Sequence, residues 1–195
     1  MQWLTTTLVL ERLRSADDDA WNMFVARFRQ PVVRFAADLG LPPHEAEDAA
    51  QETLAEFLRT YREGRYDREK GRLHSWLFGI ARRVALNRGR KLARQQQRSP
   101  AGQRTGFWDD IPDDAQLQQT WDRSWQTSIL EQCLRRVRAD LEPRTVEAFE
   151  LVALQERPAA DVADELGMSR NAVFLAKHRV LKRIRELQEE IENIV

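Results

Sequence analysis

The sequence predicts an all-α protein, and three observations support this fold class. Charged and helix-forming residues are abundant, since 32% of the 195 residues are charged and only 8 are glycine and 7 proline. Apolar residues recur at three- and four-residue spacing along most of the chain, and no alternation typical of strands persists. Breaks that contain glycine or proline separate these stretches. We therefore expect two small helical domains joined by a linker.

Two helices are expected before residue 40. The first covers Thr5 to Arg14 and has leucines as its candidate core residues. Asp17 to Asp19 then cap a second helix over Ala20 to Leu39, whose apolar side is rich in phenylalanine. Pro31 lies inside this second helix. It either kinks the helix or divides it, because proline cannot donate a backbone hydrogen bond.

A third helix is expected from about His44 to Tyr61, after the break Gly-Leu-Pro-Pro. Acidic residues in its first turn suit the helix dipole. Asp48, Gln51 and Glu52 share its outward face, because they are spaced three and four residues apart. This acidic face is either ordinary solvated surface or a docking surface for a basic partner.

A strongly basic segment follows, with eleven Lys or Arg and three acids between residues 61 and 94. From Leu73 onward apolar residues occupy one helix face and cations the opposite one. Such a face suits DNA phosphates, because each neutralised phosphate releases counterions. Trp76 lies in the apolar stripe, which favours core packing over stacking on a base. The candidate DNA-binding residues of this segment are Lys70, Arg72, His74, Arg82, Arg83, Arg88, Arg90, Lys91 and Arg94.

Residues 95–125 are expected to form a linker. Its first part, QQQRSPAGQRTG, is polar and lacks periodicity. The acidic run DDIPDD follows, together with Trp108, Trp121 and Trp125. Three tryptophans are more than a free linker needs, so part of this segment is expected to dock on a neighbouring domain or a partner.

Helices expected over Ser128–Leu141 and Pro143–Gln155, the latter with Leu154 inward, precede the most informative stretch. This stretch, from Pro158 to Leu187, reads as a short helix, a tight turn and a longer basic helix. Gly167 stands where a helix end favours a left-handed residue, and Ser169 can cap the next helix. The pattern predicts a helix-turn-helix whose second helix enters a major groove. The alternative is a helical hairpin with a solvated basic face.

The start of that second helix carries candidates for base contacts. Arg170 can pair with a guanine edge and Asn171 with adenine. Phe174 either contacts a thymine methyl group or packs under a neighbouring helix. Cations further along the helix suit phosphates. The complete candidate set for this DNA surface is Ser169, Arg170, Asn171, Phe174, Lys177, His178, Arg179 and Lys182.

Composition argues against several other classes of protein. Cys133 is the only cysteine, which leaves neither a disulfide framework nor a cysteine zinc site, and the three histidines lack ligand spacing. Acids lie on the outward helix face or in the linker and form no cluster with a histidine at ligand spacing, so no catalytic site, metal or cofactor is expected. No apolar run reaches about eighteen residues, so we expect a cytoplasmic protein without membrane insertion.

Three stretches together resemble an RNA polymerase sigma factor of the extracytoplasmic-function (ECF) subgroup of the sigma-70 family. AEDAAQETLAEFL, residues 46–58, resembles region 2.2, which implies that Asp48, Gln51 and Glu52 dock on a coiled coil of the polymerase β′ subunit. Residues 66–86 resemble regions 2.3 and 2.4, which separate the strands of the −10 promoter element and hold an everted base. Residues 141–187 resemble region 4, which reads the −35 element.

The resemblance implies a region 2-like domain over 1–94, a linker over 95–125 and a region 4-like domain over 126–195. The implied partners are core RNA polymerase, through its β′ coiled coil and β flap, promoter DNA and an anti-sigma regulator. The sequence departs from the family pattern at Arg83, where asparagine is usual, and at Phe174 and Ala176, where basic residues are common. The usual −35 consensus is therefore not expected.

The implied function is that of a transcription initiation factor, not an enzyme. The alternative is a stand-alone helix-turn-helix regulator that binds an operator as a dimer. That alternative leaves the acidic helix and the basic segment 61–94 unexplained. The two functions differ in whether DNA binding requires core polymerase. A regulator binds duplex DNA alone, whereas a sigma factor usually needs core polymerase.

Overall fold

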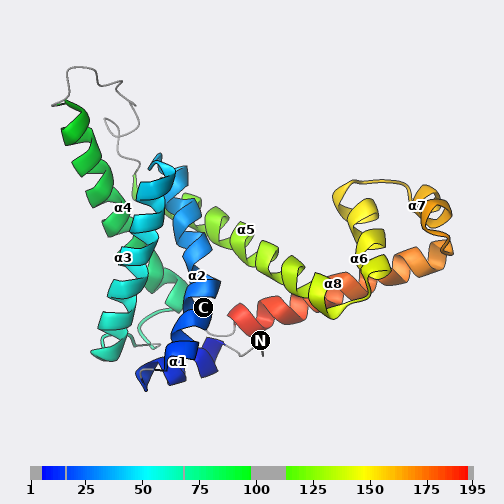
Figure 1. Ribbon diagram of the computed structural model, residues 1–195, viewed down its shortest axis with the longest axis horizontal. Coiled ribbons are helices and arrows are strands. Elements are labelled where there is room, and N and C mark those ends of the chain that lie inside the picture. Colours follow the sequence, from blue (N-terminus) through cyan, green and yellow to red (C-terminus); the bar gives the residue numbers. More distant parts are fainter. Residues whose placement is uncertain (1–5, 16, 68, 98–112, 193–195) are drawn as a thin grey trace. The chain divides into compact units, whose positions relative to one another are not determined.

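The computed structural model describes residues 6–15, 17–67, 69–97 and 113–192, which form eight α-helices and one π-helical segment without a strand (Figure 1). The all-α prediction is therefore confirmed. The described residues divide into two compact units, one up to Ser128 and the other from Ile129 to Glu192. Within the described ranges, no helix combines the length and the apolar character needed to cross a membrane.

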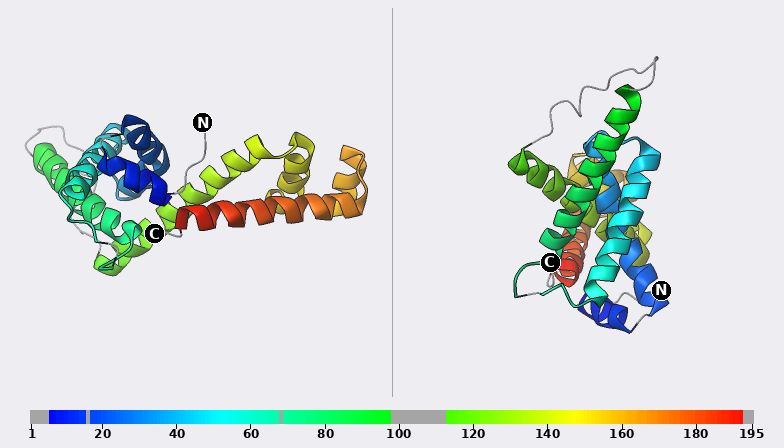
Figure 2. Two further views of the ribbon diagram at one scale, coloured as in Figure 1. Left: turned by 90° about the horizontal axis from the view of Figure 1, so that it is seen from below. Right: turned by 90° about the vertical axis from the view of Figure 1, so that its left-hand side faces the viewer.

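The first unit contains α1 (Thr6–Arg14), α2 (Asp18–Asp38), α3 (Pro43–Arg62), α4 (Leu73–Gln97) and the beginning of α5 (Asp114–Asp140). The helix α2 packs against α1 and α3, and α3 packs against α4, so that α2, α3 and α4 lie side by side in both views of Figure 2. Asp17 caps α2 by accepting a hydrogen bond from the backbone N–H of Ala20 at 3.1 Å. Since α2 continues past the buried Pro31 to Asp38, the prediction of a divided helix is wrong.

Aromatic side chains fill the core of the first unit. Phe24 of α2 stacks on Phe57 of α3, with ring centroids 4.4 Å apart. Phe35 of α2 meets Trp121 of α5 edge to face at 5.4 Å, and Phe28 stacks on Trp125 at 5.6 Å. Burial of rings of this size supplies much of a core's stability. The beginning of α5 therefore belongs to this core.

The linker prediction is wrong for residues 114–125, because α5 begins at Asp114. Asp113 accepts a hydrogen bond from the backbone N–H of Gln116 at 2.8 Å, and Leu117, Trp121 and Trp125 then recur at four-residue spacing on the buried side. The expectation that part of this segment docks on a domain is confirmed for Trp121 and Trp125. Trp108 lies outside the described residues.

The second unit contains the remainder of α5, then α6 (Pro143–Phe149), the π-helical segment η2 (Glu150–Leu154), α7 (Ala159–Leu166) and α8 (Arg170–Glu192). Its core is mostly aliphatic, with Val162 and Val173 fully buried at its centre and Cys133 buried on α5. Leu154 was predicted to face inward, but it is 54% exposed. The wider π-helical turn of η2 changes the angle between successive side chains, which moves Leu154 out of register.

The turn between α7 and α8 follows the prediction closely. Gly167 has φ +58°, in the left-handed region, and Met168 donates a backbone hydrogen bond to the carbonyl of Ala163 at 2.8 Å. The Ser169 hydroxyl accepts a hydrogen bond from the backbone N–H of Ala172 at 3.1 Å, which caps α8. The guanidinium of Arg144 donates to the Gly167 carbonyl at 3.2 Å, so α6 holds the turn. These contacts give α7 and α8 the helix-turn-helix arrangement expected from the sequence.

Candidate protein- and DNA-binding surfaces

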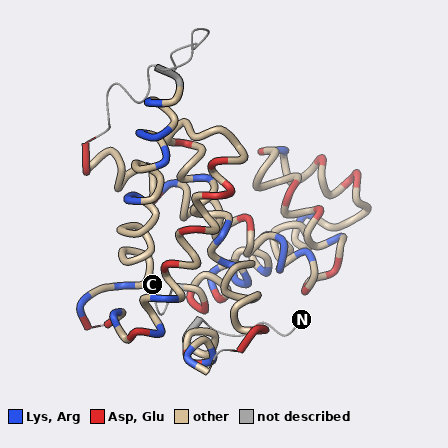
Figure 3. Tube along the Cα trace, turned by 60° about the vertical axis from the view of Figure 1, so that its left-hand side comes forward, with Lys and Arg blue, Asp and Glu red and all other residues tan. Residues whose placement is uncertain are grey.

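The three residues predicted to bind polymerase lie together on α3. Asp48, Gln51 and Glu52 are all exposed. Carboxylates recur along the same helix, as the red segments of Figure 3 indicate. We call Glu45, Asp48, Glu52 and Glu56 of α3 the acidic stripe. Its exposed members can bind cations on a partner.

Arg88 of α4 reaches into the acidic stripe instead of standing among exposed cations. Its Nη1 lies 2.7 Å from Oε2 of Glu45 and 3.3 Å from Oδ2 of Asp48. Its Nε lies 3.0 Å from Oε2 of Glu52, and its Nη2 is also 3.0 Å from that atom. Partial burial lowers the pKa of Arg88, but the hydrogen bonds to Glu45 and Glu52 outweigh it, and the net pKa is raised. Arg88 thus stays protonated, and the carboxylates of α3 fix its side chain in place.

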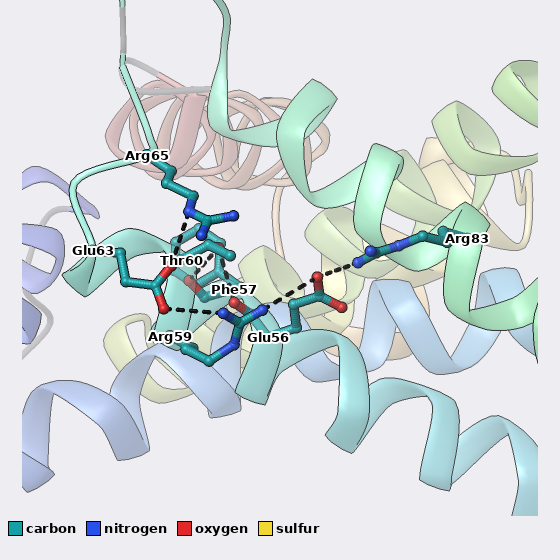
Figure 4. A network of polar contacts seen from close by, with 7 residues as sticks. All are labelled: Glu56, Phe57, Arg59, Thr60, Glu63, Arg65 and Arg83. Carbon is teal, nitrogen blue, oxygen red and sulfur yellow. Dashed lines mark hydrogen bonds and ion pairs between the residues drawn. The ribbon is translucent and has the colours of Figure 1, made fainter.

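Two more of the predicted DNA-binding cations are paired with acids. Arg83 of α4 forms an ion pair with Glu56, which also lies 3.9 Å from Nη2 of Arg59 (Figure 4). Arg82 forms an ion pair with Asp114, at the beginning of α5. The basic face of α4 therefore contains arginines whose charge is already balanced within the first unit.

The other cations of this segment are more exposed to solvent. Lys70 is 84% exposed, with its Nζ 3.5 Å from Oδ2 of Asp67, and Arg72 is exposed. Near the end of α4, exposed cations make no ion pair with any residue that the structure describes; these are Arg90, Lys91 and Arg94. No described acid therefore neutralises these three cations.

His74 does not join these exposed cations. Its ring packs edge to face on Trp125 at 4.8 Å and lies 5.5 Å from Trp121, and its Nε2 is 3.3 Å from Oδ1 of Asp122. Burial lowers the pKa of His74, and the Coulombic attraction of Asp122 offsets only part of that effect. His74 therefore holds the beginning of α5 against α4.

An open pocket lies where the loop after α3 meets the start of α4, and its volume is about 250 Å³. Tyr66 stacks on Trp76 there, with centroids 4.8 Å apart and ring planes 14° from parallel. Trp76 is half-buried and also meets Phe57 edge to face at 5.3 Å, so it serves the core and the pocket at once. Tyr66 is a site residue that the sequence did not reveal, since no helical period marks this loop. The pocket is lined by Arg65, Tyr66, Asp67, Lys70, Gly71, Arg72, Ser75 and Trp76.

The predicted DNA surface of the second unit gathers on α8. Phe174 is 58% exposed, which excludes the alternative that it packs under a neighbouring helix. Leu175 is 48% exposed beside it, and the sequence analysis missed this residue as a candidate. Lys177 is half-buried, whereas the other candidates are exposed; these are Ser169, Arg170, Asn171, His178, Arg179 and Lys182. The surface combines cations with two apolar side chains.

The first unit thus presents an acidic helix face beside a basic helix and an aromatic pocket, and the second presents a basic helix-turn-helix. Among the described residues, no cluster of three or more His, Cys, Asp or Glu could hold a metal ion. These features define a helical protein with one acidic surface and two basic surfaces.

Comparison with protein families identifies the larger part of the first unit. Residues 24–95 match the family described as Sigma-70 region 2, and this range includes the acidic stripe, the pocket and nearly all of α4. Over these residues the first unit is similar to sigma-70 region 2, and this similarity supports a role in transcription initiation. Sigma factors are initiation factors and not enzymes, so this match bears out the prediction that the chain is not an enzyme.

No curated protein matches the chain. Among solved structures, the chain is similar to one titled "Structure of CnrH in complex with the cytosolic domain of CnrY". The two sequences are 21% identical, and the similarity covers 93% of this chain and 96% of that one with a TM-score of 0.35. At this TM-score, we base no argument on the likeness.

Proposed function

We propose that the chain is a sigma factor of the ECF subgroup, which binds core RNA polymerase, directs it to specific promoters and assists strand opening. The observation that carries this proposal is the combination, within the matched region 2, of an exposed acidic helix face and an aromatic pocket rimmed by cations. A protein that only bound duplex DNA would need neither. A protein that recruits polymerase needs one surface for protein and others for DNA.

Polymerase docking is assigned to Asp48, Gln51 and Glu52. All three are exposed, and they are spaced so that a partner helix could contact them together. The sequence resemblance gives their partner as the β′ coiled coil. It also gives the β flap as a further polymerase contact, and an anti-sigma protein as the expected regulator.

Strand opening at the −10 element is assigned to the pocket over Trp76 and to the cations near it. Opening a duplex costs about 1.4 kcal/mol per stacked step. Stacking of an unpaired base on an aromatic side chain recovers about 1–3 kcal/mol, and Tyr66 and Trp76 offer such a platform. Lys70 and Arg72 line the same pocket, where they can neutralise the phosphates on either side of that base.

Recognition of the −35 element is assigned to the exposed face of α8. Arg170 and Asn171 stand in its first turn, where a recognition helix contacts base edges. Phe174 is exposed beside them and suits a thymine methyl group. His178, Arg179 and Lys182 are assigned to phosphates.

Binding to core RNA polymerase tests the proposal. We compare the wild-type chain with Asp48→Arg/Glu52→Arg by fluorescence anisotropy of the labelled protein. A matched control, Glu11→Arg/Glu189→Arg, makes the same change of net charge at exposed residues of α1 and α8. We expect tight wild-type binding, a loss of at least a hundredfold in the first variant and less than threefold in the control.

Two results would contradict the proposal. If the wild-type chain ignored polymerase but bound specific duplex DNA alone, the stand-alone regulator would replace the sigma factor. If both charge-reversal variants lost polymerase binding equally, the docking surface would not be the acidic stripe.

A further inference from the structure

One cation lies between the surface proposed for polymerase and the surface proposed for DNA. Arg88 belongs to α4, one turn before the exposed Lys91, yet its guanidinium is directed at α3. All three of its nitrogens lie within 3.3 Å of a carboxylate oxygen of Glu45, Asp48 or Glu52. Its side chain is only 24% exposed, whereas Arg90 and Lys91 are exposed.

A guanidinium in this position has little capacity left for a phosphate. It has five N–H donors in a planar fork, and the three carboxylates meet that fork on all of its nitrogens. A DNA phosphate would therefore have to compete with three negative charges for one positive charge. In the free chain, Arg88 contributes little to DNA affinity.

The carboxylates differ in how far an outside cation can reach them. The side chains of Asp48 and Glu52 are 57% and 53% exposed, whereas that of Glu45 is 22% exposed. A basic partner that docks on Asp48 and Glu52 supplies cations to the two acids that are most accessible. Those cations replace Arg88 there and leave it with Glu45 alone.

We propose that Arg88 is a shared cation, held by the acidic stripe in the free chain and released toward DNA when a cationic partner occupies Asp48 and Glu52. This inference rests on the proposed function for the identity of that partner. Because binding linkage is reciprocal, DNA that takes up Arg88 also favours docking on the stripe by the same factor. Arg88 is a positioning residue for docking and a phosphate contact only afterwards.

The test mimics the partner by removing the charge of the two exposed acids. We measure the affinity of the full chain for a labelled twenty-nucleotide oligothymidylate at low salt, without polymerase. The substitution Asp48→Asn/Glu52→Gln is made in the wild-type chain and in chains that carry Arg88→Gln or Arg90→Gln. Thermal unfolding of each variant checks that the first unit remains folded, and Arg88→Lys provides a background that keeps the charge.

We expect neutralisation of the two acids to tighten oligothymidylate binding about fivefold to tenfold in the wild-type and Arg90→Gln chains. In the Arg88→Gln chain the gain should fall to about twofold, which is the general effect of removing negative charge. The slope of log affinity against log salt should steepen by about 0.7 only where Arg88 is present, as expected for one more contacted phosphate on a single strand.

An equal gain with and without Arg88 would overturn the proposal, and so would the absence of any gain or of any detectable binding. These outcomes are independent of polymerase. If the chain failed to bind polymerase but showed the Arg88-dependent gain in oligothymidylate affinity, the proposed function would be refuted and the shared-cation proposal would still be supported.

Discussion

The two units treat the cations of their proposed DNA surfaces differently. In the first unit, Arg82, Arg83 and Arg88 of α4 are paired with acids of α3 or α5. In the second, the cations at the beginning of α8 form no ion pair with any described residue; these are Arg170, Lys177, Arg179 and Lys182. A chain with zero net charge can therefore contain two kinds of basic surface. In one, the cations are neutralised by acids of the same unit, and in the other they remain available for phosphates.

The two cores differ as well. Six phenylalanine and tryptophan side chains are among the buried residues described for the first unit, whereas the buried residues described for the second unit are mostly Val, Leu, Ala and Ile. All six tryptophans and both tyrosines precede Ile129. Tryptophan fluorescence therefore follows unfolding of the first unit alone, whereas far-UV circular dichroism follows both units. Substitutions in the two cores can be told apart by these signals.

The largest effect is expected from Trp121→Ala. This side chain is fully buried between α2, α4 and α5, and removal of such an aromatic costs about 3–5 kcal/mol. Urea unfolding followed by the fluorescence of the remaining tryptophans should show a much lower midpoint. Trp21→Ala is the control, because Trp21 is half-buried and should cost clearly less. Equal midpoints for the two variants would show that α5 is not part of the first core.

A smaller effect, confined to the second unit, is expected from Gly167→Ala. An alanine at φ +58° is strained, and its Cβ would lie 3.3 Å from Nη2 of Arg144. We expect a loss of about 1–2 kcal/mol, seen by circular dichroism but not by tryptophan fluorescence. Gly79→Ala is the matched control on α4, where the Cβ meets no atom within 4 Å and should stabilise the helix slightly. A fluorescence change with Gly167→Ala would contradict the separation of the two cores.

The difference in ion pairing predicts different salt dependence at the two DNA surfaces. Lys182→Ala removes a cation of α8 that forms no ion pair with any described residue, so it should weaken binding of the free chain to non-specific duplex DNA at low salt a fewfold and reduce the salt slope by about one. Arg83→Ala removes a cation that Glu56 already balances, so its slope change should be well below one. Filter binding across a salt series measures both. Equal changes of the salt slope in the two variants would show that the two surfaces do not differ in how far their cations are neutralised.

The smallest effect concerns pH. Burial lowers the pKa of His74, so the unfolded chain takes up a proton more readily than the folded chain. The stability contributed by neutral His74 is therefore complete above about pH 6.5 and is lost as the pH falls through the lowered pKa of the folded chain. Thermal unfolding by fluorescence should show a lower midpoint at pH 5.5 than at pH 7.5, with a flatter profile for His74→Gln. His44→Gln, at a histidine that is 75% exposed, is the matched control substitution.

Sequence reasoning succeeded where the physical cause is local. Gly167 and Ser169 could be predicted because helix ends require particular residues at fixed positions. It failed where a contact joins distant parts of the chain. Arg88 meets Glu45 across 43 residues, and no pattern within α4 reveals that its charge is already balanced.

Two other differences have separate reasons. The beginning of α5 was assigned to a linker together with the polar, aperiodic stretch and the acidic run before it, although Leu117, Trp121 and Trp125 do follow a helical period. Exposure of Phe174 could not be predicted, because the same aromatic residue on a helix suits a core and a DNA-reading surface alike. The polymerase and DNA contacts themselves stay predictions.

The buried position of Cys133 gives the second unit a chemical reporter of its own. It is the only thiol in the chain, and its side chain is fully buried on the part of α5 that belongs to the second unit. A thiol reagent can reach it only when the second unit opens, so the rate of labelling measures the free energy of that opening under native conditions. Tryptophan fluorescence and thiol labelling of one unmodified sample can therefore follow each unit separately while polymerase or DNA is added.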